Sequence, residues 1–322
     1  MMKIFHRRIL GIVLRAIISF GILIFLFFRI KMKSFLDIIN TADLGILFFA
    51  FLLFLVSNIL CFVRWQMILK GLKINFYPLI LLSSFSGGLF FNLFFPSTIG
   101  GDFLRITDLS LRTQKTKEVF SSVILDRLSG YLALDFIIIF ALLFGHRIIL
   151  DKKIFFIVIG FSILLITLLF ILFNNFLYTK LSNFLSLFKN RFFSILVDVH
   201  NCIYQFRYQK AIILKSFFIS LLSQLIGIGV AFMVALSLNK LINIGYFFLF
   251  IPLIGAITTL PISIGGLGLR EALFIFFFGS IGLSRDFCLA LSLLNFVFIL
   301  IISSLGGIIY AFTLHLGRIQ HH

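Results

Sequence analysis

Six runs of about twenty or more predominantly apolar residues dominate the sequence, and each is long enough to cross a bilayer as one helix. Hydrophobic residues make up 61% of the chain and charged residues 12%, against roughly 45–50% and 25% in soluble domains. This composition excludes an ordinary soluble protein and a disordered one. The sequence therefore predicts an all-α polytopic membrane protein with full spans at residues 9–28, 44–63, 119–144, 154–173, 211–238 and 287–314.

Basic residues are concentrated between these runs. The chain has 28 Lys and Arg against 11 Asp and Glu, a net charge of +17. If both termini are cytoplasmic, 17 basic residues lie on the cytoplasmic side and eight on the other side, in agreement with the positive-inside rule. This distribution predicts contact with anionic lipid headgroups and argues against nucleic acid as a partner.

Three other segments depart from the simple pattern of spans. Residues 78–99 and 245–280 are apolar but interrupted by Pro and Gly, which predicts two re-entrant hairpins. Residues 175–209 carry apolar side chains every three or four positions, which predicts a basic amphipathic helix on the cytoplasmic face. Two placements stay open for this helix: it lies in the membrane interface, or it packs on the bundle as a connector.

The sequence contains an internal repeat. The ten residues from Pro96 to Arg105 match the ten from Pro261 to Arg270 at six positions without a gap, at an offset of 165 residues. The same offset aligns the spans on either side of each hairpin. The predicted topology gives the two halves opposite orientations, and broken segments at matching positions of inverted repeats are typical of transport sites near the midplane. The repeats cover residues 9–145 and 154–314.

The hairpins have the composition of an anion site. Each Pro ends a helix, the glycines allow tight turning, and a helix that restarts beyond the turn directs its N–H groups and positive dipole end at a ligand. Phosphate is the expected ligand of such a site. The residues expected to shape this backbone are Pro96, Gly100, Gly101, Pro261, Gly265, Gly266 and Gly268.

Charged residues in or beside the hairpins are the candidate binding residues. A guanidinium suits a phosphate, and carboxylates within apolar sequence usually face a cavity or a partner. An ion-pair network that only clamps the hairpins is the alternative. The expected substrate-binding residues are Asp102, Arg105, Asp126, Arg127, Arg270 and Glu271.

Other polar residues receive more ordinary interpretations. Arg64 and Trp65 end the second run and are interpreted as interfacial anchors. Asp135 fits either a local hydrogen bond or a proton relay. The three cysteines and six histidines form no metal-ligating or catalytic pattern, so the sequence predicts no metal, no cofactor and no catalytic residues.

These motifs also carry a family resemblance. Arg64-Trp65, the Gly-Gly-Asp-x-x-Arg pattern ending at Arg105, Asp126-Arg127 and the glycine-rich segment ending at Glu271 resemble the lysylphosphatidylglycerol synthase/flippase transmembrane family. The likeness covers roughly residues 8–315. It implies a multi-pass protein of a bacterial or archaeal cytoplasmic membrane that moves lipid between leaflets. Because the chain ends at His322, without the aminoacyl-transferase domain of the synthases, we do not expect it to make the lipid itself.

The predicted function is therefore lipid translocation rather than enzymatic catalysis. The expected substrate is a phospholipid or a polyprenyl-phosphate-linked lipid. Two alternatives stay open: a membrane-embedded transferase or hydrolase acting on a lipid phosphate, and an assembly factor for lipid enzymes that transports nothing. For protein partners, a second copy of the chain and an enzyme of lipid synthesis are both compatible with the sequence.

Overall fold

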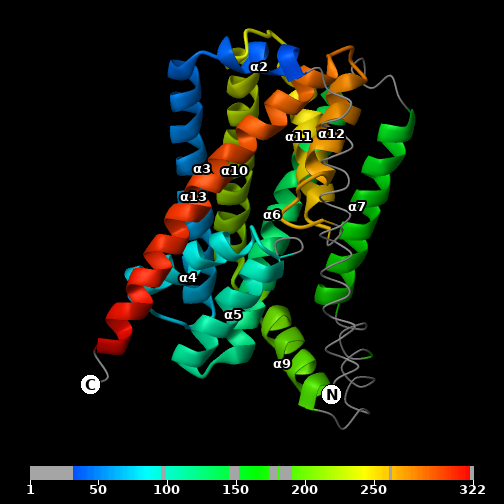
Figure 1. Cartoon of the computed structure of the whole chain (residues 1–322). Helices are drawn as coiled ribbons and strands as arrows, with labels where there is room; N and C mark the ends of the chain where they lie inside the picture. Colours follow the sequence, from blue (N-terminus) through cyan, green and yellow to red (C-terminus); the bar gives the residue numbers. More distant parts are fainter. Residues whose placement is uncertain are drawn as a thin grey trace, which may run out of the picture. The chain divides into compact units, whose positions relative to one another are not determined.

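The computed structural model describes residues 32–95, 99–144, 152–174, 180, 191–260 and 263–319. Within these ranges the chain folds into helices and contains no strand (Figure 1). Three of the described helices are long and apolar enough to cross a membrane: α3 (Leu44–Gly71), α10 (Lys210–Ser237) and α13 (Arg285–Ile319). They confirm helices at three of the six predicted spans.

Two further predicted spans are helical, and their crossing of a membrane stays a prediction. They are α6 (Thr116–Phe144) and α7 (Lys152–Phe173). The predicted span at 9–28 lies outside the described residues. The first described helix is the short α2 (Met32–Asn40), which packs on α13.

Both Pro/Gly-interrupted segments contain a break between two short helices, and the first segment, residues 78–99, ends where its second helix begins. The first pair is α4 (Pro78–Phe91) and α5 (Ile99–Thr113), and the second is α11 (Ile244–Thr258) and α12 (Leu269–Gly279). The longest has 15 residues and therefore spans about 22 Å, less than the ~30 Å of a hydrocarbon core. The breaks in the helices are thus confirmed, and a re-entrant course through the membrane stays a prediction.

The order of the helices repeats at the offset found in the sequence. Helices α3, α4, α5 and α6 correspond to α10, α11, α12 and α13, and most matched starts differ by only a few residues from 165. Helix α12 begins five residues later than α5 predicts. The delay has a local cause, because Gly265, Gly266 and Gly268 have φ values of 57°, 75° and 78°, which a right-handed helix does not accommodate. The inverted orientation of the halves stays a prediction.

The chain divides into two compact units, and each takes segments from both halves of the sequence. The first unit is Met1–Val56, Ser83–Leu104 and Ile226–His322, and the second is Ser57–Leu82 and Arg105–Leu225. In the first unit α12 packs on both α11 and α13 through buried phenylalanines, with the ring centroids of Phe250 and Phe278 5.2 Å apart. Helices α4 and α13 approach closely, since a Cβ on Gly306 would lie 2.5 Å from the carbonyl oxygen of Ser86.

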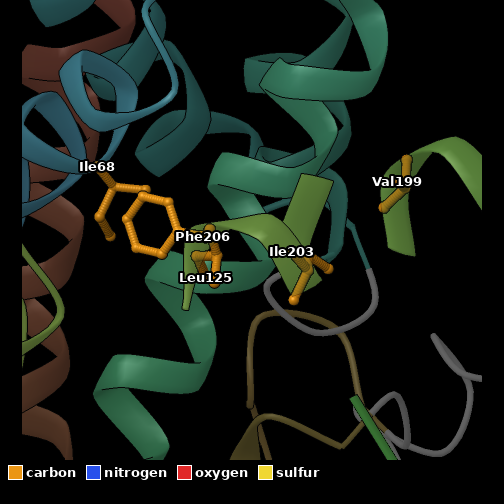
Figure 2. Close-up of a cluster of buried hydrophobic side chains, with 5 residues drawn as sticks. All are labelled: Ile68, Leu125, Val199, Ile203 and Phe206. Carbon is orange, nitrogen blue, oxygen red and sulfur yellow. The ribbon is translucent and has the colours of Figure 1, made fainter. Parts of the chain in front are cut away.

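The second unit has its own apolar core around α9 (Arg191–Phe206), which packs on α6 and α7. Phe206 lies beside Ile68 and Leu125, and Ile203 and Val199 extend the same buried face along α9 (Figure 2). Of the two placements left open for the amphipathic segment, this packing favours the connector for residues 191–206. The part of the prediction that covers 175–179 and 181–190 lies outside the described residues.

Candidate functional site

The two helix breaks contact each other inside the first unit. The amide N–H of Gly265, in the second break, donates to the carbonyl oxygen of Phe95, in the first, at 3.2 Å. A Cβ on Gly265 would lie 3.2 Å from the carbonyl oxygen of Leu93, and its φ of +57° is unfavourable for other residues. The backbone conformation therefore strongly favours glycine at this contact, and the nearby carbonyl oxygen of Leu93 adds to that preference.

Glycine also sets the geometry of the first break. A Cβ on Gly101 would lie 2.1 Å from the carbonyl oxygen of Gly88, so the first turn of α5 lies directly against the end of α4. The Gly101 amide donates to Oδ1 of Asn92 at 2.8 Å. Gly100 is equally confined, against the side chain of Phe95. The predicted positions Pro96 and Pro261 lie outside the described residues.

A cavity of about 400 Å³ lies where the breaks meet, and all of its lining residues belong to the first unit. Asn92 and Leu93 reach it from the first break, and Gly265 and Gly266 from the second. Its volume is in the range of small-molecule sites, and its lining is mostly apolar. The polar residues that line it are Asn92, Thr258, Thr259, Arg270, Asn295 and Ser303.

Arg270 is the charged residue at the wall of the cavity, and it is paired with Glu271. Its Nη2 donates to Oε1 of Glu271 at 2.7 Å, and its Nε lies 3.2 Å from the same oxygen. Ser292, on α13, lies within hydrogen-bonding distance of both side chains. The guanidinium also lies over the ring of Phe296, 4.3 Å from its centroid. The pair brings together two residues that the sequence predicted as binding residues.

Glu271 has a second role, because it caps its own helix. Its Oε2 accepts from the amide of Gly268 at 2.6 Å, and the residue is completely buried. The amide of Gly101 is likewise taken by Asn92. At each predicted anion site, one of the amides at the helix start thus already donates to a protein acceptor. The group that faces the cavity with positive charge is the Arg270 side chain.

A second charged cluster lies in the second unit, where Asp126 binds two arginines. Its Oδ1 accepts from Nε of Arg64 at 2.7 Å, and its Oδ2 accepts from Nη2 of Arg105 at 3.2 Å. Nη1 of Arg64 donates to Ser220 at 2.9 Å. All three charged residues are buried. We call Arg64, Arg105 and Asp126 the Asp126 cluster. It joins segments of α3, α5, α6 and α10.

The interpretation of Arg64 and Trp65 as interfacial anchors is wrong. Arg64 is buried in its ion pair, and Trp65 is completely buried. The Trp65 indole N–H donates to Ser122 at 3.2 Å, and the guanidinium of Arg105 lies 4.1 Å from the indole centroid. The available signal was Asp126 itself, because an acidic residue within an apolar span usually faces a cavity or a partner.

The remaining predicted residues are Asp102 and Arg127, together with Asp135. Asp102 is a partly buried residue in the first turn of α5 and is not among the residues that line the cavity. Arg127 is partly buried on α6. Asp135 is buried and accepts from Ser162 at 2.5 Å, which is the local hydrogen bond that was one of its two interpretations.

Sequence reasoning missed the neutral polar groups of the cavity. Asn92 and Asn295 lie within apolar stretches, and an amide in such a stretch was the available signal. For cation binding, no group of three His, Cys, Asp or Glu side chains in the described ranges is arranged to hold a metal ion.

Long apolar helices, buried ion pairs and a cavity at two contacting helix breaks define a helical membrane protein with an internal cavity. Comparison with protein families shows to which family this membrane protein belongs. The family model described as the lysylphosphatidylglycerol synthase TM region matches residues 12–307, and the chain belongs to this family. No curated protein and no solved structure matches the chain.

Proposed function

We propose that this protein moves a phospholipid or a polyprenyl-phosphate-linked lipid between the two leaflets of a membrane. The observation that carries the proposal is the cavity, which both helix breaks border and which Arg270 lines. Irregular backbone at membrane depth is tolerated where it is buried in protein or lines a cavity. Residues of both breaks line this cavity. Membership of a lipid-handling membrane family supports the same function.

In this proposal the headgroup enters the cavity while the acyl or prenyl chains stay in the bilayer. Arg270 binds the phosphate, and Glu271 holds Arg270 in place when the cavity is empty. The short helix pairs are re-entrant hairpins of two inverted repeats, and rocking of the repeats opens the cavity to one leaflet and then to the other. Proton coupling or the lipid gradient supplies the energy.

The proposal includes a location and an orientation. We place the protein in a bacterial or archaeal cytoplasmic membrane with both termini in the cytoplasm, as the distribution of basic residues favours. A second copy of the chain or an enzyme of lipid synthesis is the proposed protein partner.

For the Asp126 cluster we propose the structural role that the sequence left open. Its contacts join segments of four helices within one unit. Breaking a buried pair by removing one partner typically costs about 3–5 kcal/mol, so such a cluster holds its helices in one arrangement. As a separate part of the proposal, Asp102 and Arg127 contact the substrate, the role that the sequence predicts for them.

The first prediction concerns Arg270→Gln. Purified protein is reconstituted into liposomes with acyl-labelled phosphatidylglycerol, and dithionite bleaches the outer leaflet. We expect wild type to expose the protected pool to the quencher and the variant to slow this exchange by roughly ten- to a hundredfold, because a charge-assisted contact to phosphate is worth roughly 1.5–3 kcal/mol.

Arg112→Gln serves as the matched control. Arg112 pairs with Asp108 on α5 and does not line the cavity, so exchange should stay at the wild-type rate. Equal slowing by both variants, or wild-type exchange in Arg270→Gln with folded protein confirmed, would contradict the proposed site.

A further inference from the structure

Within the described part of the chain, the cavity is lined by one cationic side chain and by no acidic one. Among the described residues, Arg270 is the only ionisable side chain that lines it. For acidic residues this statement covers nearly the whole chain, because Asp151 is the one acidic residue of the sequence outside the described ranges. Glu271 is completely buried and is not a lining residue. A bound headgroup therefore meets a cation and neutral groups.

Arg270 has one nitrogen left for a ligand. Nε and Nη2 contact Glu271, and within the described part of the chain Nη1 has no hydrogen-bond partner. The other polar lining side chains are two amides and three hydroxyls. Thr258, Thr259 and Asn295 donate to backbone carbonyl oxygens close in sequence, and their oxygens are of the kind that accept from uncharged hydroxyls. The apolar remainder of the lining suits the glycerol backbone and the first methylenes of a lipid.

We propose that the cavity selects a lipid whose headgroup carries phosphate and uncharged hydroxyls, and that it disfavours a headgroup with an added ammonium, as in lysyl-phosphatidylglycerol. The inference rests on the proposed function and names its substrate class. A phosphate pairs with Nη1 of Arg270, and hydroxyls pair with the amides and hydroxyls. A headgroup ammonium finds no carboxylate on the cavity wall, and burying it unpaired is costly.

Asn92 offers a variant that changes the charge of the cavity with little change in shape. Its Oδ1 accepts from the Gly101 amide at the start of α5. Asp at this position has the same size and keeps an acceptor for that amide, so Asn92→Asp adds one negative charge to the wall.

Asn243→Asp is the matched control. Asn243 caps the start of α11 by accepting from the Gly245 amide at 2.9 Å, the same role in another helix, and it does not line the cavity. The two variants therefore make the same chemical change at two helix starts, and only one of them is at the cavity.

The experiment measures exchange of acyl-labelled phosphatidylglycerol and acyl-labelled lysyl-phosphatidylglycerol in liposomes. We expect wild type to move the first at least about tenfold faster, since like-charge juxtaposition is strongly disfavoured. Asn92→Asp should lower the ratio of phosphatidylglycerol exchange to lysyl-phosphatidylglycerol exchange by at least about tenfold. Asn243→Asp should leave this ratio unchanged. Equal exchange of the two lipids by wild type, or equal effects of the two variants, overturns the inference.

A binding measurement separates this inference from the proposed function. Native mass spectrometry of the intact protein with the same lipids reports retention without transport. Preferential retention of phosphatidylglycerol with no exchange of either lipid supports the selective cavity and contradicts translocation. Exchange of both lipids without a preference for either supports translocation and contradicts the selective cavity. Glycerol 1-phosphate, added as a soluble competitor, should displace the lipid only weakly. Displacement when its concentration equals that of the lipid would assign the cavity to a soluble phosphate ester and overturn the lipid assignment.

Discussion

At the scale of single residues, two carboxylates pair with the three buried arginines of the described part of the chain, and they differ in what they neutralise. Asp126 binds two arginines, Arg64 and Arg105, and is buried with them. Glu271 binds one arginine and one backbone amide. A buried ion pair is weak evidence for stability, but removing one partner leaves an uncompensated charge. The two carboxylates should therefore respond differently to neutralisation.

Asp126→Asn should destabilise the protein strongly, by about 3–5 kcal/mol, because it removes the carboxylate that two buried arginines share. Thermal unfolding in detergent measures the effect. Arg112→Gln, which removes a partly exposed pair within α5, should cost no more than about 1 kcal/mol. An Asp126→Asn protein that keeps its stability but has lost lipid exchange would transfer this carboxylate from the structural to the binding role.

At the scale of elements, α9 shows how an amphipathic helix is fixed to its neighbours. Its apolar face packs against α6 and α7, and His200, on the same helix, is buried. Burial lowers the pKa of His200 below its ordinary value of 6.5, against the opposing effect of a hydrogen bond with the backbone of Leu172. The folded protein thus holds this imidazole in its neutral form.

The docking of α9 should therefore weaken in acid. The unfolded segment binds a proton at His200 more readily than the folded one, so stability is complete above pH 6.5 and falls as the pH drops below that value. Amide hydrogen exchange in α9 should accelerate between pH 7.5 and pH 5.5, after correction for the intrinsic rate. His200→Gln should remove this acceleration, and an acceleration that persists in that variant would identify another group as its source.

At the scale of the whole molecule, the sequence repeat and the positions of the helices agree, and the orientation of the halves is the main prediction still to be tested. Helices α3–α6 and α10–α13 follow each other in the same order at nearly the same offset. Four exposed lysines near helix ends distinguish the proposed topology: Lys33, Lys73, Lys115 and Lys240.

Single cysteines at these positions, in a protein whose three native cysteines are replaced, report the side of the membrane. In spheroplasts, an impermeant maleimide should label Lys33→Cys and Lys240→Cys, and should label Lys73→Cys and Lys115→Cys only after lysis. Labelling of all four from outside would reject the proposed topology, and labelling of Lys33→Cys alone would place the second half in the wrong orientation.

Much of the fold was predictable because its signals are local. Apolar runs mark α3, α10 and α13, and the matching Pro-Gly patterns mark the two breaks. The pairing of Arg270 with Glu271 does not follow from adjacency, because neighbouring side chains on a helix do not normally face each other. The partners of Asp126 were not predictable either, since Arg64 lies 62 positions earlier and Ser220 contacts that arginine from 156 positions later. The roles of Asn92 and Asn295 require the cavity to be known, because an isolated amide in an apolar segment has many possible partners.

Glu271 connects the electrostatics of the cavity to the fraying of a helix. The same carboxylate closes the first turn of α12 through the Gly268 amide and neutralises Arg270. When that turn unwinds, the carboxylate loses the geometry that holds it beside the guanidinium, and the wall of the cavity gains positive charge. In the proposed function, the charge that a headgroup meets in the cavity therefore depends on whether this one turn of helix is wound or unwound.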